Sequence, residues 1–150
     1  MSYFTAVLAR DGKAWTTHDL ELDRAGADDL GELTAELRGL VDGDEPVLVL
    51  VEREDAWWAV VRVDGDEDPR VFVSDLAGAA ASPYADLLAL VEDDDEVPEP
   101  GCGGDLDVLA DLGTPPDTLQ EMCDDEVLPM DALATVAEAA GFAEVLDALR

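Results

Sequence analysis

The fold is decided by residues 46–74, which read PVLVLVEREDAWWAVVRVDGDEDPRVFVS. The stretch opens with a continuous apolar run, Pro46–Val51, which is typical of a strand covered on both faces. A second run rich in β-forming residues, Ala56–Val63, and a third, Arg70–Ser74, follow after short charged segments. Three strands joined by such short links predict an antiparallel meander.

The residues before this meander predict a hairpin and a helix. Tyr3–Arg10 and Lys13–His18 are rich in β-forming residues and flank Asp11-Gly12, a two-residue turn signal. A helix is then indicated by an apolar stripe at the helical period, and Gly43 is placed to end it. The first 75 residues therefore predict the order ββαβββ, with the helix packed on one face of a mostly antiparallel sheet and the other face partly open. The residues of the stripe are Leu30, Leu33, Leu37, Leu40 and Val41.

The β patterns stop after Asp75. Ser82-Pro83 predicts the start of a short helix that continues to Val91. Residues 92–104 combine an acidic run with prolines and glycines, which is typical of a linker. The last third predicts short helices with separate apolar stripes, one of them capped by Thr114 before Pro115 and another ended by Gly141. The stripes are Leu106, Leu109, Leu112; Leu119, Met122, Cys123; Met130, Leu133, Val136, Ala137, Ala140; and Phe142, Val145, Leu146, Leu149.

These elements predict an α+β fold in three parts. Residues 1–91 are expected to form the sheet unit, residues 92–104 an acidic Pro/Gly linker, and residues 105–150 a helical segment packed on the sheet unit. The apolar run Val47–Val51, like every other apolar run of the chain, is far shorter than a membrane span. The first residues lack the basic and apolar regions of a signal peptide. We therefore expect a cytoplasmic protein that does not enter the membrane.

Charge is the main functional clue in the sequence. The 150 residues include 38 acidic and eight basic ones, for a formal net charge of −30 at pH 7. Residues 71–150 contain Arg150 as their one basic residue. Such a surface repels nucleic acid and anionic lipid and attracts basic proteins and cations. A GC-rich genome or a high-salt cytoplasm would favour the same composition without any role for the charge.

One loop offers oxygen ligands for a cation. Asp64, Asp66 and Asp68 occupy positions 1, 3 and 5 of a calcium-binding loop, and Asp75 falls at position 12. Position 6 is Pro69 where the sharp turn of that loop requires glycine, and the flanking segments read as strands. A solvated hairpin loop is the favoured explanation of the pattern. The three aspartates are the candidate metal ligands of the chain.

No residue pattern predicts catalysis or a bound cofactor. His18 is the single histidine, and no nucleophile motif lies near it in the sequence. Cys102 and Cys123 are too few for a typical zinc site, and a disulfide between them is not expected in a reducing cytoplasm. The acidic residues around Cys102 oppose formation of a reactive thiolate.

Aromatic residues supply candidates for a protein contact. Trp57 and Trp58 are neighbours on a predicted strand, so their side chains point to opposite faces of the sheet. An exposed Trp58 beside Arg62 has the composition of a binding hot spot. Phe142, in the last helical stretch, is the third candidate. For the two tryptophans, the favoured alternative is that both are buried under the helices.

Three segments resemble the tRNA adenosine deaminase-associated proteins of actinobacteria: Tyr3–Arg10, Glu54–Asp75 and Leu133–Arg150. The resemblance spans nearly the whole chain. It implies an association with a tRNA adenosine deaminase, because the family takes its name from genes next to that of the deaminase. It implies no catalytic residues. The chain itself lacks the His-x-Glu and Pro-Cys-x-x-Cys elements that hold and use zinc in such deaminases.

Three hypotheses for the function remain. The first is a non-enzymatic acidic accessory protein that binds a basic protein surface, plausibly that of a tRNA adenosine deaminase, without contacting nucleic acid directly. The second is a metal-dependent module or small enzyme that uses the Asp64, Asp66 and Asp68 loop. The third is a stand-alone acidic domain with no electrostatic partner.

Overall fold

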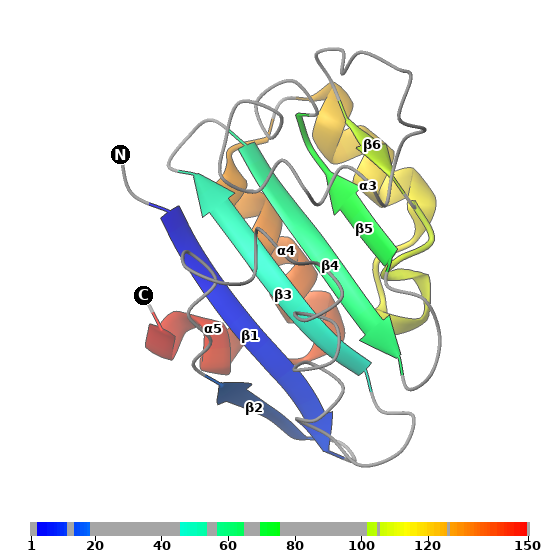
Figure 1. Cartoon of the computed structure of the whole chain (residues 1–150). Helices are drawn as coiled ribbons and strands as arrows, with labels where there is room; N and C mark the ends of the chain where they lie inside the picture. The colour runs from blue at the N-terminus through cyan, green and yellow to red at the C-terminus, as the bar shows by residue number, and fades with distance from the viewer. Residues whose placement is uncertain are drawn as a thin grey trace, which may run out of the picture.

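A computed structural model of the chain describes residues 3–11, 14–18, 46–53, 57–64, 70–75, 102–104, 106–125 and 127–149 (Figure 1). These residues form a six-stranded sheet and a set of short helices. The strands are β1 (Tyr3–Asp11), β2 (Ala14–His18), β3 (Pro46–Arg53), β4 (Trp57–Asp64), β5 (Arg70–Val73) and β6 (Gly103–Gly104). The helices are the 3₁₀ helix η3 (Ala110–Leu112) and the α-helices α3 (Pro116–Asp124), α4 (Pro129–Ala140) and α5 (Ala143–Leu149).

The sheet has the strand order β2-β1-β3-β4-β5-β6, and every neighbouring pair is antiparallel. The predicted α+β class, the hairpin β1–β2 and the meander β3–β4–β5 are therefore confirmed. The helix expected over residues 30–41 and the short helix expected from Ser82 to Val91 lie outside the described residues.

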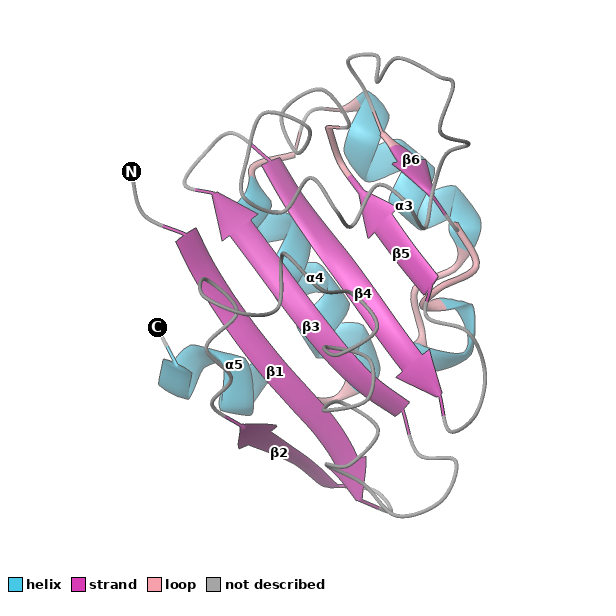
Figure 2. Ribbon diagram, viewed as in Figure 1, coloured by secondary structure: helices cyan, strands magenta, loops and turns pink. Residues whose placement is uncertain are grey.

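The described helices all lie on one face of the sheet, with α4 behind β3 and β4 (Figure 2). Alternation along the strands explains which side chains meet them, because every second residue of a strand points to the same face. The helix-facing positions and the helical apolar residues form one buried cluster. Its sheet members are Ala6, Leu8, Trp15, Leu48, Leu50, Trp58, Val60 and Phe72, and its helical members include Leu109, Leu119, Leu133, Val136, Phe142 and Leu146.

The opposite face of the sheet is also buried. The side chains of Val49, Trp57, Val61 and Val71 are each at most 2% exposed, although the described helices lie on the other side. The expectation of a partly open second face is therefore wrong. Burial on both faces accounts for the unbroken apolar run that opens β3.

Trp15 connects the edge strand β2 to the helices. Its indole N–H donates a hydrogen bond to the Ala140 carbonyl at 3.2 Å, close to the end of α4. Its ring packs edge-on against Phe142, with 5.1 Å between ring centroids. The turn between α4 and α5 is made by Gly141, whose φ of 95° is left-handed, so this glycine ends α4 as expected.

The strand β6 lies inside the stretch that composition assigns to the linker. Gly103 and Gly104 pair with Val73 and Phe72 at the edge of the sheet. Gly104 has a φ of +113°, and a Cβ atom built on it would clash with the Val71 carbonyl oxygen. Glycine is required here both by the backbone conformation and by the close approach to β5.

Among the described residues, no helix has the length and apolar character that crossing a membrane requires.

Replacing Gly104 tests the close approach of β6 to β5. The Gly104→Ala variant should lose about 3 kcal/mol of unfolding free energy, because backbone strain and a forced shift of the neighbouring strand act together. Urea denaturation measures this loss. The matched control is Gly141→Ala, where φ is also positive but no atom lies within 4 Å of the added methyl group. The control should lose only about 1 kcal/mol. Equal losses in the two variants would contradict the close approach.

Candidate interaction surface

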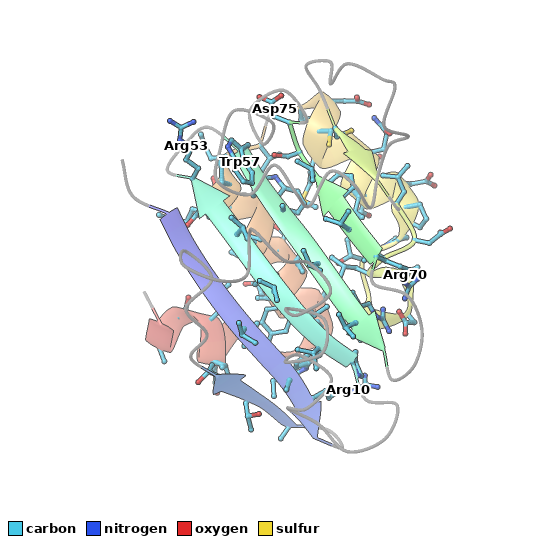
Figure 3. All side chains as sticks on the ribbon, viewed as in Figure 1. Arg10, Arg53, Trp57, Arg70 and Asp75 are labelled. Atoms are coloured by element: carbon cyan, nitrogen blue, oxygen red, sulfur yellow. The ribbon has the colours of Figure 1, made fainter. Side chains whose placement is uncertain are left out.

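Charge is segregated between the two layers of the molecule. The helical layer, defined as residues 106–125 and 127–149, contains no Lys, Arg or His. The described basic residues all belong to strands: Arg10 to β1, Arg53 to β3, Arg62 to β4 and Arg70 to β5. Figure 3 shows three of them, Arg10, Arg53 and Arg70, at strand ends.

Every acidic side chain of the helical layer is exposed. Because the apolar stripes of α3 and α4 turn toward the sheet, the polar residues between them face outward. Asp117 and Asp131 also sit in the first turns of these helices, where a negative charge is favoured by the helix dipole. All charged side chains of this layer are therefore negative and exposed to solvent. The exposed carboxylates belong to Asp107, Asp111, Asp117, Glu121, Asp124, Asp125, Asp131, Glu138, Glu144 and Asp147.

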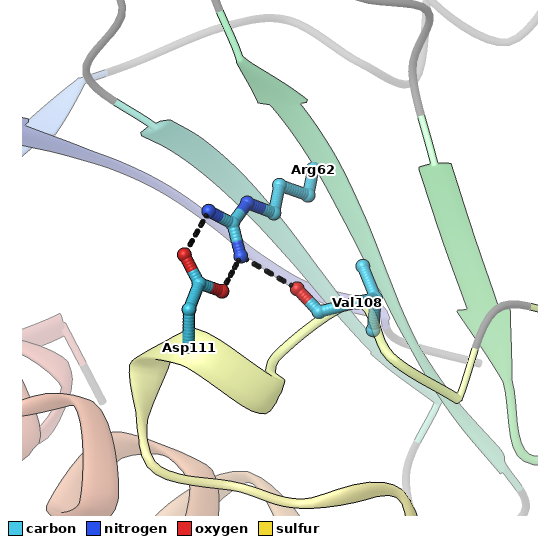
Figure 4. A network of polar contacts seen from close by, with 3 residues as sticks. All are labelled: Arg62, Val108 and Asp111. Atoms are coloured by element: carbon cyan, nitrogen blue, oxygen red, sulfur yellow. Dashed lines mark hydrogen bonds and ion pairs between the residues drawn. The ribbon is translucent and has the colours of Figure 1, made fainter.

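One of these carboxylates is held by a buried cation from the sheet (Figure 4). Arg62 is 4% exposed on the helix-facing side of β4. Its Nη1 donates to Asp111 Oδ1 and to the Val108 carbonyl, and its Nη2 donates to Asp111 Oδ2 at 2.8 Å. This two-pronged pairing is the strong form of an arginine–carboxylate contact. It fixes η3 and the residues before it against the C-terminal half of β4.

The pairing also sets the protonation of the carboxylate. The hydrogen bonds from Arg62 hold the pKa of Asp111 below its usual range, and they outweigh the effect of partial burial, which acts in the opposite direction. Asp111 is thus ionised at neutral pH and compensates the buried guanidinium.

The three predicted contact residues are all buried, so the expectation that Trp58 is exposed is wrong. Trp58 is 2% exposed and packs on Phe72, with 5.2 Å between the ring centroids. Arg62 is hydrogen-bonded to Asp111 and to the Val108 carbonyl. Phe142 is fully covered and packs against Trp15. Trp57 and Trp58 do point to opposite faces, as the strand alternation predicts, but both faces are covered. A role for these side chains in binding would require them to leave the core.

The predicted metal ligands are only partly described. Asp64 ends β4, while Asp66 and Asp68 lie outside the described residues. Arg70–Val73 form β5 and pair with β4, so these residues are not part of a twelve-residue loop between helices. Among the described residues, no group of three or more His, Cys, Asp or Glu side chains is arranged to hold a metal ion. Cation binding by the three aspartates stays a prediction. His18 ends β2, and its side chain lies outside the described part of the structure.

The two cysteines lie close to each other. Cys102 directly precedes β6, and Cys123 belongs to α3; both are half-buried thiols that pack against the core and form no disulfide. Gln120, three residues before Cys123 on α3, has its amide nitrogen 3.9 Å from the Cys102 sulfur. Burial, together with a hydrogen bond to Cys102 and the charge of Asp124, raises the pKa of Cys123 far above that of an ordinary thiol. Cys123 is therefore kept protonated at neutral pH.

Two exposed apolar residues were missed by the sequence analysis. Met130 fits the apolar stripe of the predicted helix, yet it is 55% exposed, and the buried face of α4 includes Ala132 instead. Leu128, the residue before α4, is 50% exposed. Helical spacing identifies a stripe, but it does not tell whether the first turn of that stripe is covered.

The predicted cap at Thr114 is also wrong, because α3 begins at Pro116 after an extended Pro115 without a side-chain cap.

Comparison with known proteins now places the chain. The sequence model of a family described as Rv3753c-like tRNA adenosine deaminase-associated protein matches residues 3–143. The chain belongs to this family. The resemblance seen in the sequence is thereby confirmed. No curated protein and no solved structure matches the chain.

In this family member, the contribution of the Arg62–Asp111 pair can be measured by its pH dependence. The Asp111→Asn variant should lose about 1–2 kcal/mol of unfolding free energy at pH 7, less than for a fully buried pair because the Asp111 side chain is 64% exposed. The folded-state pKa of Asp111 is depressed, so its stabilisation is complete above the unfolded pKa of about 3.9 and disappears as the pH falls through the lower folded value.

Chemical denaturation of wild type and variant between pH 7 and pH 2 checks this expectation. The difference between the two proteins should be constant at neutral pH and shrink toward zero in acid. Glu138→Gln, an exposed change on α4, is the matched control and should show a difference near zero throughout. A pH-independent loss in Asp111→Asn would contradict the ionic origin of the stabilisation.

Protonation of Cys123 predicts slow alkylation. In a Cys102→Ser variant, which leaves a single thiol, Cys123 should react with iodoacetamide at pH 8 at least tenfold more slowly than the same chain in urea, because only the thiolate is nucleophilic. Mass spectrometry follows the modified fraction over time. Equal rates in the folded and unfolded chain would show that burial does not protect this thiol.

Proposed function

We propose that this chain is a non-enzymatic accessory protein that binds the tRNA adenosine deaminase in the cytoplasm through its helical layer. The observation that carries the proposal is the composition of that layer, in which ten exposed carboxylates occur without a single basic residue. The family description supports the choice of partner, since it names an association with this deaminase.

Electrostatics supports the choice of surface. An enzyme that acts on tRNA must present positive charge to the phosphate backbone of its substrate. A surface of the opposite sign, like the helical layer, is complementary to it. Such complementarity mainly speeds the encounter of two proteins and excludes wrong partners, while the affinity comes from a smaller set of close contacts.

Binding at that surface has a consequence for the enzyme. A protein that covers the positive surface of the deaminase competes with tRNA, so the accessory protein would act as a regulator of substrate access. No chemistry of its own is needed for this role.

The test is the binding of the purified chain to the purified deaminase. Association should be fast at about 50 mM salt and slow markedly at about 500 mM salt, where charges are screened beyond a few ångströms. A variant with three neutralised carboxylates, Glu121→Gln, Asp125→Asn and Glu138→Gln, should associate about tenfold more slowly at low salt, with little change in dissociation rate.

The matched control changes three exposed neutral residues of the same layer, Ala134→Ser, Thr135→Ser and Ala148→Ser, and should associate like the wild type. Stopped-flow fluorescence or surface plasmon resonance measures both rates. The proposal fails if the wild-type chain does not bind the deaminase at low salt, or if binding responds neither to salt nor to the neutralised carboxylates.

A further inference from the structure

Leu128 and Met130 are the large apolar side chains that the described part of the chain leaves exposed. They stand on either side of Pro129, which is buried at the start of α4. Leu106, Val127 and Val145, the other described residues of this kind in the helical layer that are not fully buried, are half-buried and pack against the core. Single exposed apolar residues are ordinary on a protein surface, but two that flank one buried proline call for an explanation.

Local stability does not explain these two residues. Leu128 occupies the position just before α4, with an extended backbone and no side-chain hydrogen bond to the helix. Ser, Thr, Asp or Asn at such a position would satisfy an exposed backbone N–H and stabilise the helix relative to an apolar residue. Met130, exposed in the first turn, adds little to the core beneath it. Both residues therefore depart from what folding alone favours, which is expected of functional positions.

The surroundings of the pair define the chemistry of a partner. Asp124 and Asp125 lie just before it in the chain and Asp131 just after it, and all three are exposed. An apolar centre with a charged rim is the usual arrangement of a protein interface. The complementary surface has an apolar pocket bordered by Lys or Arg. A second copy of this chain does not fit, because two molecules of formal net charge −30 repel each other.

We propose that Leu128 and Met130 form the apolar anchor that docks the helical layer into a pocket on a basic protein surface. This inference rests on the proposed function and names the contact residues that give the complex its lifetime. The exposed carboxylates of the layer speed association with the partner, and the apolar anchor slows dissociation. Charge and apolar contact therefore control different steps of binding.

The test is the double variant Leu128→Ser and Met130→Gln, titrated against the tRNA adenosine deaminase. Serine is a favoured residue before a helix, so the variant should be at least as stable as the wild type, and a thermal melt checks this. We expect dissociation to become at least tenfold faster, with an unchanged association rate and an unchanged salt dependence, since no charge is altered. Ala148→Gln, an exposed change on α5, is the control and should bind like the wild type.

The possible outcomes separate the two proposals. Normal binding by the double variant overturns the anchor and leaves the proposed function standing. Absence of binding by the wild-type chain overturns the proposed function and the anchor with it. Concentration-dependent dimers of the wild type that the double variant abolishes, seen by light scattering, would assign the pair to self-association and also overturn the inference.

Discussion

A single buried guanidinium sets the arrangement of the two layers. Arg62 is the only buried cation among the described residues, and its charge cannot be removed by deprotonation. It must therefore meet an anion, and Asp111, far along the chain on η3, supplies one. Leaving the buried guanidinium without an anionic partner is destabilising, so the pair favours the return of the helical segment to β4 at this point. The apolar residues of α3, α4 and α5 complete the attachment, because they pack into one buried cluster with the sheet.

The same pairing determines the character of the surface. The helical layer has no positive charge of its own, and Arg62, which reaches it from the sheet, is paired with Asp111. Its other carboxylates repel one another, which opposes folding. The buried residues beneath them, such as Leu133, Val136 and Phe142, offset this repulsion. The apolar interior thus keeps the layer folded despite its charge. The proposed function uses that charge.

Much of the sheet could be predicted because its signals are local. The apolar run of β3 and the adjacent tryptophans of β4 identify strands without reference to the rest of the chain. The missed features depend on distant residues. Burial of Arg62 depends on Asp111, and β6 consists of two glycines that have no strand preference of their own. At the candidate site, the acidic character was evident from composition, whereas the exposure of Met130 depends on how α4 lies on the sheet.

The edges of the sheet have one more consequence. A sheet with two buried faces can still grow sideways if a long edge strand offers its backbone to another chain. Among the described strands, one border is β6, only two residues long, and the other is β2, five residues long and connected by Trp15 to the helices. Short borders give an incoming strand few groups to pair with. A chain so rich in valine is thereby protected from edge-to-edge aggregation by the brevity of its outermost strands.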